Sequence, residues 1–312
     1  MAKAGITFKA RLRAWWEGVE VTPDDLADGP RRRTPRLEMP VAAPPVATPL
    51  EEWETARTRI TQLVWGHGFD KPGGPDHILD LAKSFELEAG KVVMDFGTGL
   101  GGAARILSQK FDVTVMAFEG DPILSRAGKQ ISVLDGLDRK ADIQRYVPGE
   151  FDPVQNSFDC VLSTEALHAF DSKYDTIALL LKGLRPKGHL AITDYTLGPG
   201  VSPHDKRLRD FQTGSLDLWR QDQYEQRFTE MNLDLKSSQD ITDEYRNMIL
   251  QGWMNFAQGD QLTFATARAH PAAVIAELNL WTKRLDALEK GLVRFVRFHA
   301  VKRTGARLMS DW

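Results

Sequence analysis

The sequence has little cysteine, no long apolar run and no excess of charge of one sign. Its single cysteine, Cys160, cannot form an internal disulfide, and the apolar residues around it predict a buried strand. No window approaches eighteen apolar residues, and the N-terminus lacks the apolar core of a signal peptide. The 40 basic and 43 acidic side chains nearly balance, so nucleic acid is not an expected partner. These absences predict a soluble, cytoplasmic protein.

What is present is ordinary globular composition, with 42% hydrophobic and 27% charged residues over 312 positions. This length suits one large domain with appendages, or two small domains. The patterning predicts four segments, which are an amphipathic helix over 1–20, a proline-rich linker over 21–49, a helical cap over 50–90 and a ligand-binding α/β domain over 91–302.

The first segment predicts a basic amphipathic helix, because its large apolar residues recur at helical spacing: Phe8, Leu12, Trp15, Trp16 and Val19. Two interpretations stay open. The helix docks on the protein's own surface or on a second copy, which we favour, or residues 6–19 bind the surface of a membrane, where tryptophan beside basic residues suits the headgroup layer.

The cap should contain a helix from Leu50 to Gly66, a glycine-punctuated loop, and a second helix that Asp76 caps and that runs to Phe85. From Lys91 onward, short apolar strands alternate with helices. Seven strands are expected, at 92–96, 113–118, 142–146, 158–163, 189–195, 233–238 and 292–301. Helices are expected between them, including helical sequence around 206–228 and two helices inserted before the last strand. Repeated βα units predict a mostly parallel sheet with helices on both faces.

A glycine cluster follows the first of these strands, in the run from Asp95 to Gly102. Gly97, Gly99 and Gly102 would also satisfy the pattern of a dinucleotide site, so the glycines alone do not decide the ligand. An acid directly before the loop, Asp95, would repel a pyrophosphate but help a cationic ligand. S-adenosylmethionine carries a sulfonium and an ammonium and no phosphate, and the acid that ends the second strand, Glu119, suits ribose hydroxyls.

These residues resemble the class I S-adenosylmethionine-dependent methyltransferases, whose pattern is an acid, G-x-G-x-G, and an acid closing the second strand. The resemblance implies a Rossmann-like fold with an antiparallel last strand and S-adenosylmethionine as the cofactor. It implies eight donor-binding residues, Asp95, Gly97, Thr98, Gly99, Gly101, Glu119, Gly120 and Glu165. The Asp that usually meets the adenine is missing from the run 146–150, which leaves backbone groups or Glu150 for that role.

Three stretches point to one branch, the phosphoethanolamine N-methyltransferases. The run 65–74 resembles F-G-x-x-F/Y-x-S-x-G-G, Asp95–Gly102 resembles D-I-G-S-G-L-G-G, and 191–195 resembles I-T-D-Y. Trp281, Lys283 and Arg284 before the last strand are also similar to that family. Its substrate tyrosine falls on Tyr195 and its active-site histidine on His168, but its partner tyrosine falls on Trp53 and its phosphate-clamping arginine aligns near Ser215. The resemblance therefore implies the fold of this family, but it gives less support for a phosphorylated amine as the substrate.

Methyl transfer needs a positioned nucleophile and usually a proton acceptor. We expect catalysis from His168 as the base, with Asp194 and Tyr195 at the end of the fifth strand. His168 could instead pack as the start of a helix, and Asp194 could bond to local backbone. Trp53, His67 and Tyr195 are the candidates for the acceptor pocket, with no metal expected.

The sequence thus predicts an S-adenosylmethionine-dependent methyltransferase that acts on nitrogen or oxygen of a small-molecule acceptor, with an amine as one candidate. One alternative is an enzyme for a lipid headgroup or a protein, recruited through residues 1–49. Another is a catalytically weak S-adenosylmethionine-binding module, and a nicotinamide oxidoreductase is a more distant possibility.

Overall fold

The computed structural model describes residues 50–170, 172–211 and 216–304, and it leaves the side chains of residues 50–54 undescribed. The predicted segments 1–20 and 21–49 lie outside the described residues, as does Ser215. None of the helices in the described ranges combines the length and apolarity needed to cross a membrane.

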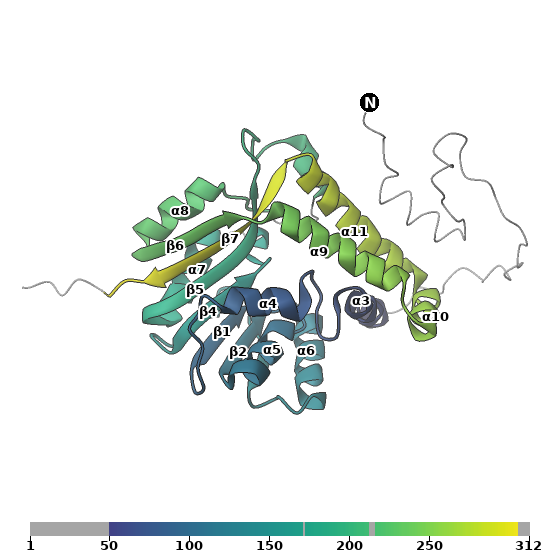
Figure 1. Cartoon of the computed structure of the whole chain (residues 1–312), viewed down its shortest axis with the longest axis horizontal. Coiled ribbons are helices and arrows are strands. Elements are labelled where there is room, and N and C mark those ends of the chain that lie inside the picture. Colours follow the sequence, from purple (N-terminus) through teal and green to yellow (C-terminus); the bar gives the residue numbers. More distant parts are fainter. Residues whose placement is uncertain (1–49, 171, 212–215, 305–312) are drawn as a thin grey trace, which may run out of the picture.

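The core of the fold is a seven-stranded sheet in the order β3-β2-β1-β4-β5-β7-β6 (Figure 1). All strands run parallel except β7, which pairs antiparallel with both of its neighbours, β5 and β6. The strands are β1 (Val92–Phe96), β2 (Thr114–Glu119), β3 (Ala141–Arg145), β4 (Phe158–Thr164), β5 (Leu184–Leu197), β6 (Leu233–Asp240) and β7 (Val293–Lys302). The predicted mostly parallel sheet with an antiparallel last strand is confirmed.

Helices cover both faces of this sheet, because successive strand side chains point to opposite sides. In β1, Val93 belongs to one apolar cluster and Met94 to another on the opposite face. One face is covered by α4 (Gly74–Ala82), α5 (Gly102–Phe111) and α6 (Pro122–Leu134), and the other by α7 (Lys173–Gly183) and α8 (Gln221–Glu230).

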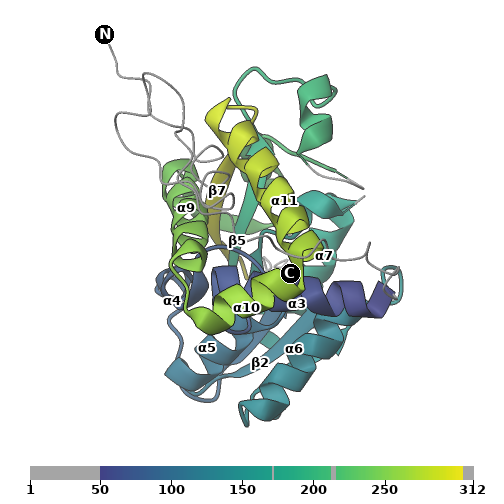
Figure 2. The ribbon, with the colours of Figure 1, turned by 90° about the vertical axis from the view of Figure 1, so that its right-hand side faces the viewer.

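Four helices pack together beside the sheet (Figure 2), and they are α3 (Leu50–Trp65), α9 (Thr242–Ala257), α10 (Gln261–Ala269) and α11 (Pro271–Glu289). Trp65 joins three of them, since its ring centroid lies 4.7 Å from that of Trp281 and 6.2 Å from that of Trp253. All three tryptophans are buried. They stabilise the contact between the N-terminal and C-terminal parts of the described chain.

Several predicted boundaries are wrong. α4 begins at Gly74 with Gly73 as its N-cap, not after Asp76, because Pro75 in its first turn favours an early start. The helical sequence expected around 206–228 is a short 3₁₀ helix at Lys206–Asp210 followed by α8. β5 starts at Leu184 rather than at 189, and α10 was not predicted.

Candidate functional site

The loop between β1 and α5 follows a buried acid, Asp95, which is the next-to-last residue of β1. One of its oxygens accepts a 2.5 Å hydrogen bond from the Thr98 hydroxyl, whereas Oδ1 is buried without a partner. Burial raises the pKa of Asp95 to about 6, although the Thr98 hydrogen bond and the charge of Lys71 oppose the shift. A buried carboxylate with an unpaired oxygen is costly, which is typical of a ligand site rather than of a structural core.

Two glycines of this loop have no room for a side chain. Gly97 has φ +72, and a Cβ there would lie 2.3 Å from Cβ of Ala166. Gly99 has φ +60, and a Cβ there would lie 2.0 Å from Oδ1 of Asp70. Neighbouring segments therefore press directly against the loop backbone, as a glycine cradle requires.

We predict that Gly97→Ala lowers the free energy of unfolding by about 2 to 4 kcal/mol, from the positive φ and the clash together. Gly136→Ala is the matched control, because Gly136 has φ +69 but nothing within 4 Å of its added Cβ. Urea unfolding of both variants measures the difference. If both variants lost the same free energy of unfolding, the close approach of Ala166 to Gly97 would add nothing to the cost of the substitution.

Glu119 ends β2 and holds the loop from the side. Its Oε2 accepts a 2.7 Å hydrogen bond from the amide of Gly99, and its Oε1 accepts one of 2.9 Å from the amide of Asp121. Burial raises the pKa of Glu119, against the Asp121 amide and the charge of Lys71. The predicted acid at the end of the second strand is therefore in direct contact with the glycine loop.

The loop over 66–73 lies on top of the glycine loop. Arg105, buried in α5, donates to the carbonyls of Gly68 at 3.1 Å and Leu100 at 2.9 Å, which ties the two loops together. The ammonium of Lys71 donates to the carbonyls of Gly97 at 2.7 Å and Thr164 at 2.9 Å. These bonds close the 66–73 loop over the ends of β1 and β4.

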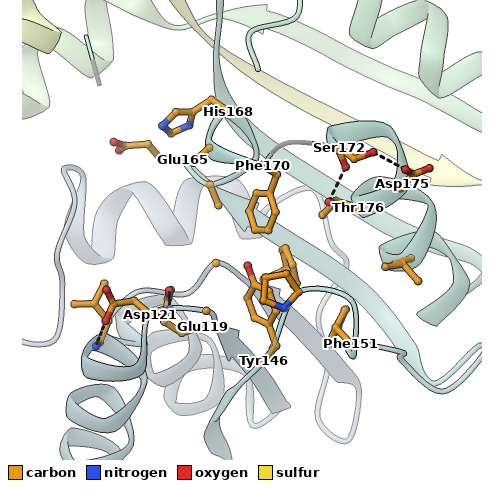
Figure 3. Close-up of a pocket in the computed structure, with 18 of the residues that line it drawn as sticks. Glu119, Asp121, Tyr146, Phe151, Glu165, His168, Phe170, Ser172, Asp175 and Thr176 are labelled. Carbon is orange, nitrogen blue, oxygen red and sulfur yellow. Dashed lines mark hydrogen bonds between the residues drawn. The ribbon is translucent and has the colours of Figure 1, made fainter. Parts of the chain in front are cut away.

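A cavity of about 850 Å³ opens beside these loops. Of the predicted donor-binding residues, Gly97, Glu119, Gly120 and Glu165 line it, and His168 lines it as well. Figure 3 shows His168 and Glu165 at one end and Glu119 and Asp121 at the other. The cavity thus joins the glycine loop to the expected catalytic histidine.

Aromatic side chains surround the part of the cavity where the adenine-binding acid is missing. The ring of Tyr146 stacks on Phe96 at 4.8 Å, and Phe170 lies nearly parallel to Tyr146 with centroids 6.2 Å apart (Figure 3). Phe151 also lines the cavity, whereas Glu150 does not. Stacking surfaces, rather than a carboxylate, are what this region offers to a planar ring.

His168 follows β4 in a short 3₁₀ helix, Leu167–Ala169, and is buried. Its Nδ1 lies 2.8 Å from Oδ1 of Asp194 on β5. Asp194 also accepts from Lys173 Nζ at 3.2 Å and from the Tyr224 hydroxyl at 2.6 Å. Burial alone would raise the pKa of Asp194, but the charges of Lys173 and His168 and these hydrogen bonds hold it well below its usual range.

An ionised Asp194 only accepts hydrogen bonds, so Nδ1 of His168 carries the proton of that bond. The Nε2 of a neutral imidazole is then left as a proton acceptor at a residue that lines the cavity. Lys173, which is fully buried, compensates the negative charge of Asp194. The arrangement is an oriented imidazole beside a ligand cavity.

Glu165, which has a positive φ of 50, makes contacts on the other side of His168. Its carboxylate forms an ion pair with Arg284 and accepts from the hydroxyls of Tyr245 and, at 3.4 Å, Tyr195. The guanidinium of Arg284 also lies 4.7 Å from the Trp281 ring centroid. Glu165 therefore contacts α11 through Arg284, and it also lines a smaller pocket together with Thr98.

Two of the three predicted pocket residues, Tyr195 and His67, do not line the cavity. Tyr195 is fully buried beneath His168, with ring centroids 5.0 Å apart, and does not line the cavity. The His67 side chain is 69% exposed and pairs with Asp135 on the surface. Trp53 lies in α3, but its side chain is outside the described set. Among the predicted donor residues, Asp95, Gly99 and Gly101 do not line the cavity, and Thr98 lines a smaller adjoining pocket.

Sequence reasoning missed Lys71, Arg105, Lys173, Tyr224 and Arg284. Lys71 and Arg105 had a local signal, since they lie within or just after runs already singled out. Lys173 and Tyr224 had no local signal, because they contact Asp194 from 21 and 30 positions away in the sequence. Their role depends on how α7 and α8 pack on the sheet.

Comparison with known proteins agrees with this site. The family model described as "Methyltransferase domain" matches residues 74–238. The 27-O-demethylrifamycin SV methyltransferase of Amycolatopsis mediterranei is 28% identical over 221 residues, which is 68% of this chain and 78% of that protein. Phosphoethanolamine N-methyltransferase 2 of Caenorhabditis elegans is 28% identical over 155 residues, covering 48% of this chain and only 35% of the relative.

Among solved structures, the chain is similar to Haemonchus contortus phosphoethanolamine N-methyltransferase 2, in complex with phosphomonomethylethanolamine and S-adenosylhomocysteine. The TM-score is 0.65 and the identity 21%, over 80% of this chain and 58% of that one. At this identity the likeness establishes the fold.

Proposed function

This chain belongs to the methyltransferase-domain family and is an S-adenosylmethionine-dependent methyltransferase, and we propose that it methylates a nitrogen or oxygen atom of a small-molecule acceptor. The observation that carries the proposal is that one cavity joins the glycine loop at Gly97 to His168, whose imidazole is oriented by Asp194. Such a cavity lets a methyl donor and a nucleophile meet.

The site fits this donor on its own chemistry. Its glycine cradle has no room for side chains, Asp95 keeps an unpaired buried oxygen, and the Gly97 carbonyl already binds a cation. When bound, S-adenosylmethionine supplies a methyl group activated by a sulfonium. We propose that Asp95 favours its positive charge, that Glu119 accepts from the ribose hydroxyls, and that Tyr146 and Phe170 stack on the adenine.

His168 is proposed as the general base. Asp194 fixes its ring and its tautomer, and Lys173 balances the negative charge of Asp194. Tyr195, packed edge-on against His168, is proposed as a support for the ring rather than a residue in contact with the acceptor. Glu165, paired with Arg284, is proposed to bound the acceptor side.

The charges argue against a phosphate on the acceptor. The full positive charge on the acceptor side belongs to Arg284, and Glu165 already pairs with it. Beyond Phe170, on the far side of the cavity from Glu165, the lining offers the hydroxyls of Ser172 and Thr176 and the acid Asp175 (Figure 3). This lining suits an amine or hydroxyl compound without a phosphate.

The direct test is incubation with isotopically labelled S-adenosylmethionine and a metabolite extract, followed by mass spectrometry of the labelled product. We expect label in a small molecule, on nitrogen or oxygen. Label found only in lipid or protein would favour the alternative acceptors. A version starting at residue 50 separates the two, because only recruitment through residues 1–49 requires that segment.

If no acceptor takes the label although S-adenosylhomocysteine binds, the protein would be a donor-binding module and the proposed turnover would be wrong.

The 1–20 helix, with membrane or self-association through residues 6–19, also stays a proposal. So does a cytoplasmic location, which suits the buried thiol of Cys160, whose pKa burial raises to about 12.

A further inference from the structure

The ammonium of Lys71 occupies the backbone cradle of the donor site. It donates to the carbonyls of Gly97 and Thr164, which end β1 and β4 side by side in the sheet. Within the described part of the chain no carboxylate lies within 4 Å of its Nζ. The ammonium therefore hydrogen-bonds to two carbonyl oxygens and forms no direct ion pair, although its charge also lowers the pKa of Asp95 and of Glu119 from farther away.

Acids dominate the glycine-loop side of the cavity, where Asp70, Glu119 and Asp121 line it. Lys71 and Arg284 are the fully charged cations among the described lining residues. Arg284 pairs with Glu165, so it is not available to a ligand at the glycine loop. A ligand carboxylate entering this side needs a counter-charge, and Lys71 can provide it.

We propose that Lys71 is a donor-binding residue. When S-adenosylmethionine binds, Lys71 releases the carbonyls of Gly97 and Thr164, which then accept from the α-ammonium of the ligand. The Lys71 ammonium pairs instead with the α-carboxylate of the ligand. This inference rests on the proposed function and adds a residue specific to this chain. In the F-G-x-x-F/Y-x-S-x-G-G pattern that 65–74 resembles, the place of Lys71 is serine.

This exchange of hydrogen-bond partners is expected to favour ligand binding. At the carbonyls one ammonium replaces another, so the hydrogen bonds lost by Lys71 are regained by the ligand. The new ion pair between Lys71 and the carboxylate is the net gain, in a site where the carboxylate would otherwise face three acids. Removing Lys71 should therefore weaken amino-acid-bearing ligands, even though it also empties the cradle.

The test is calorimetric binding of two probes to Lys71→Met. S-adenosylhomocysteine has the amino-acid end, and 5′-methylthioadenosine keeps the adenosine but lacks that end. We expect S-adenosylhomocysteine to bind about tenfold or more weakly than to the wild type, while 5′-methylthioadenosine binds equally well. Lys71→Arg, which keeps the charge, should retain most of the affinity for S-adenosylhomocysteine. Lys83→Met is the matched control, because the Lys83 side chain is 78% exposed.

Each other outcome overturns the inference. Tighter binding of S-adenosylhomocysteine would show that Lys71 only blocks the cradle, and unchanged binding would show that it has no role. Equal weakening of both probes would indicate a structural effect on the 66–73 loop. If the wild type bound neither probe, the donor assignment itself would fail, which separates that failure from this one.

Discussion

Replacing His168 with glutamine is expected to lower kcat by about 100-fold or more, because the imidazole is the proton acceptor of the proposed reaction. Glutamine has similar size and can still donate to Asp194, but it cannot take up a proton at neutral pH. Initial rates with the acceptor found by the labelling screen measure the effect. The pH profile of kcat should differ between the variant and the wild type.

His67→Gln is the matched control, since His67 is exposed on the 66–73 loop and should leave kcat unchanged. Affinity for S-adenosylhomocysteine should also be unchanged in the His168 variant, which separates lost chemistry from lost structure. Asp194→Asn should lower kcat too, because an amide that donates to Nδ1 leaves Nε2 protonated. A His168 variant with wild-type kcat and pH profile would remove the base assignment.

Asparagine in place of Asp95 is expected to stabilise the fold and weaken donor binding at the same time. Burial raises the pKa of Asp95 in the folded protein to about 6, well above the usual value for an aspartate, so ionised Asp95 opposes folding at neutral pH. That shift of about two units corresponds to about 3 kcal/mol, and the unpartnered amide of asparagine reduces the gain to about 1 to 3 kcal/mol. S-adenosylmethionine should bind about tenfold or more weakly to Asp95→Asn, because the neutral amide no longer attracts its cationic groups.

The sign of the pH dependence follows from the raised pKa. The cost of ionised Asp95 is fully present above pH 6 and is lost as the pH falls toward 4, so the stability advantage of Asp95→Asn should shrink over that range. Urea unfolding at several pH values measures this, with Asp112→Asn as the control because the Asp112 side chain is 74% exposed. An Asp95 variant that is less stable than the wild type at pH 7 would contradict the interpretation.

The sequence alone predicted the parts of the fold that are local in the chain. Alternating apolar strands gave the seven strands to within a few residues, apart from the early start of β5. The glycine loop was predictable because a strand, an acid and glycines with positive φ are contiguous there. The placing of His168 after β4, beside Asp194 at the end of β5, followed from two parallel neighbours ending at one edge of the sheet.

The remaining parts of the site depend on contacts between distant segments. Arg284 reaches Glu165 across 119 positions, and no local pattern in the sequence predicts that ion pair. Tyr195 was expected in the pocket because it ends a strand, but α9 and β7 bring Tyr245 and Phe295 against it and bury it. No single-sequence periodicity reports such packing.

The position of β7 has a consequence for how the protein matures. This strand fills the gap between β5 and β6, so both remain unpaired along one edge until residues 293–302 emerge from the ribosome. The half of the sheet that carries the glycine loop pairs earlier in synthesis, through β1, β2, β3 and β4. During translation, nascent chains should therefore expose open strand edges on the Asp194 side, where chaperones or aggregation would act first.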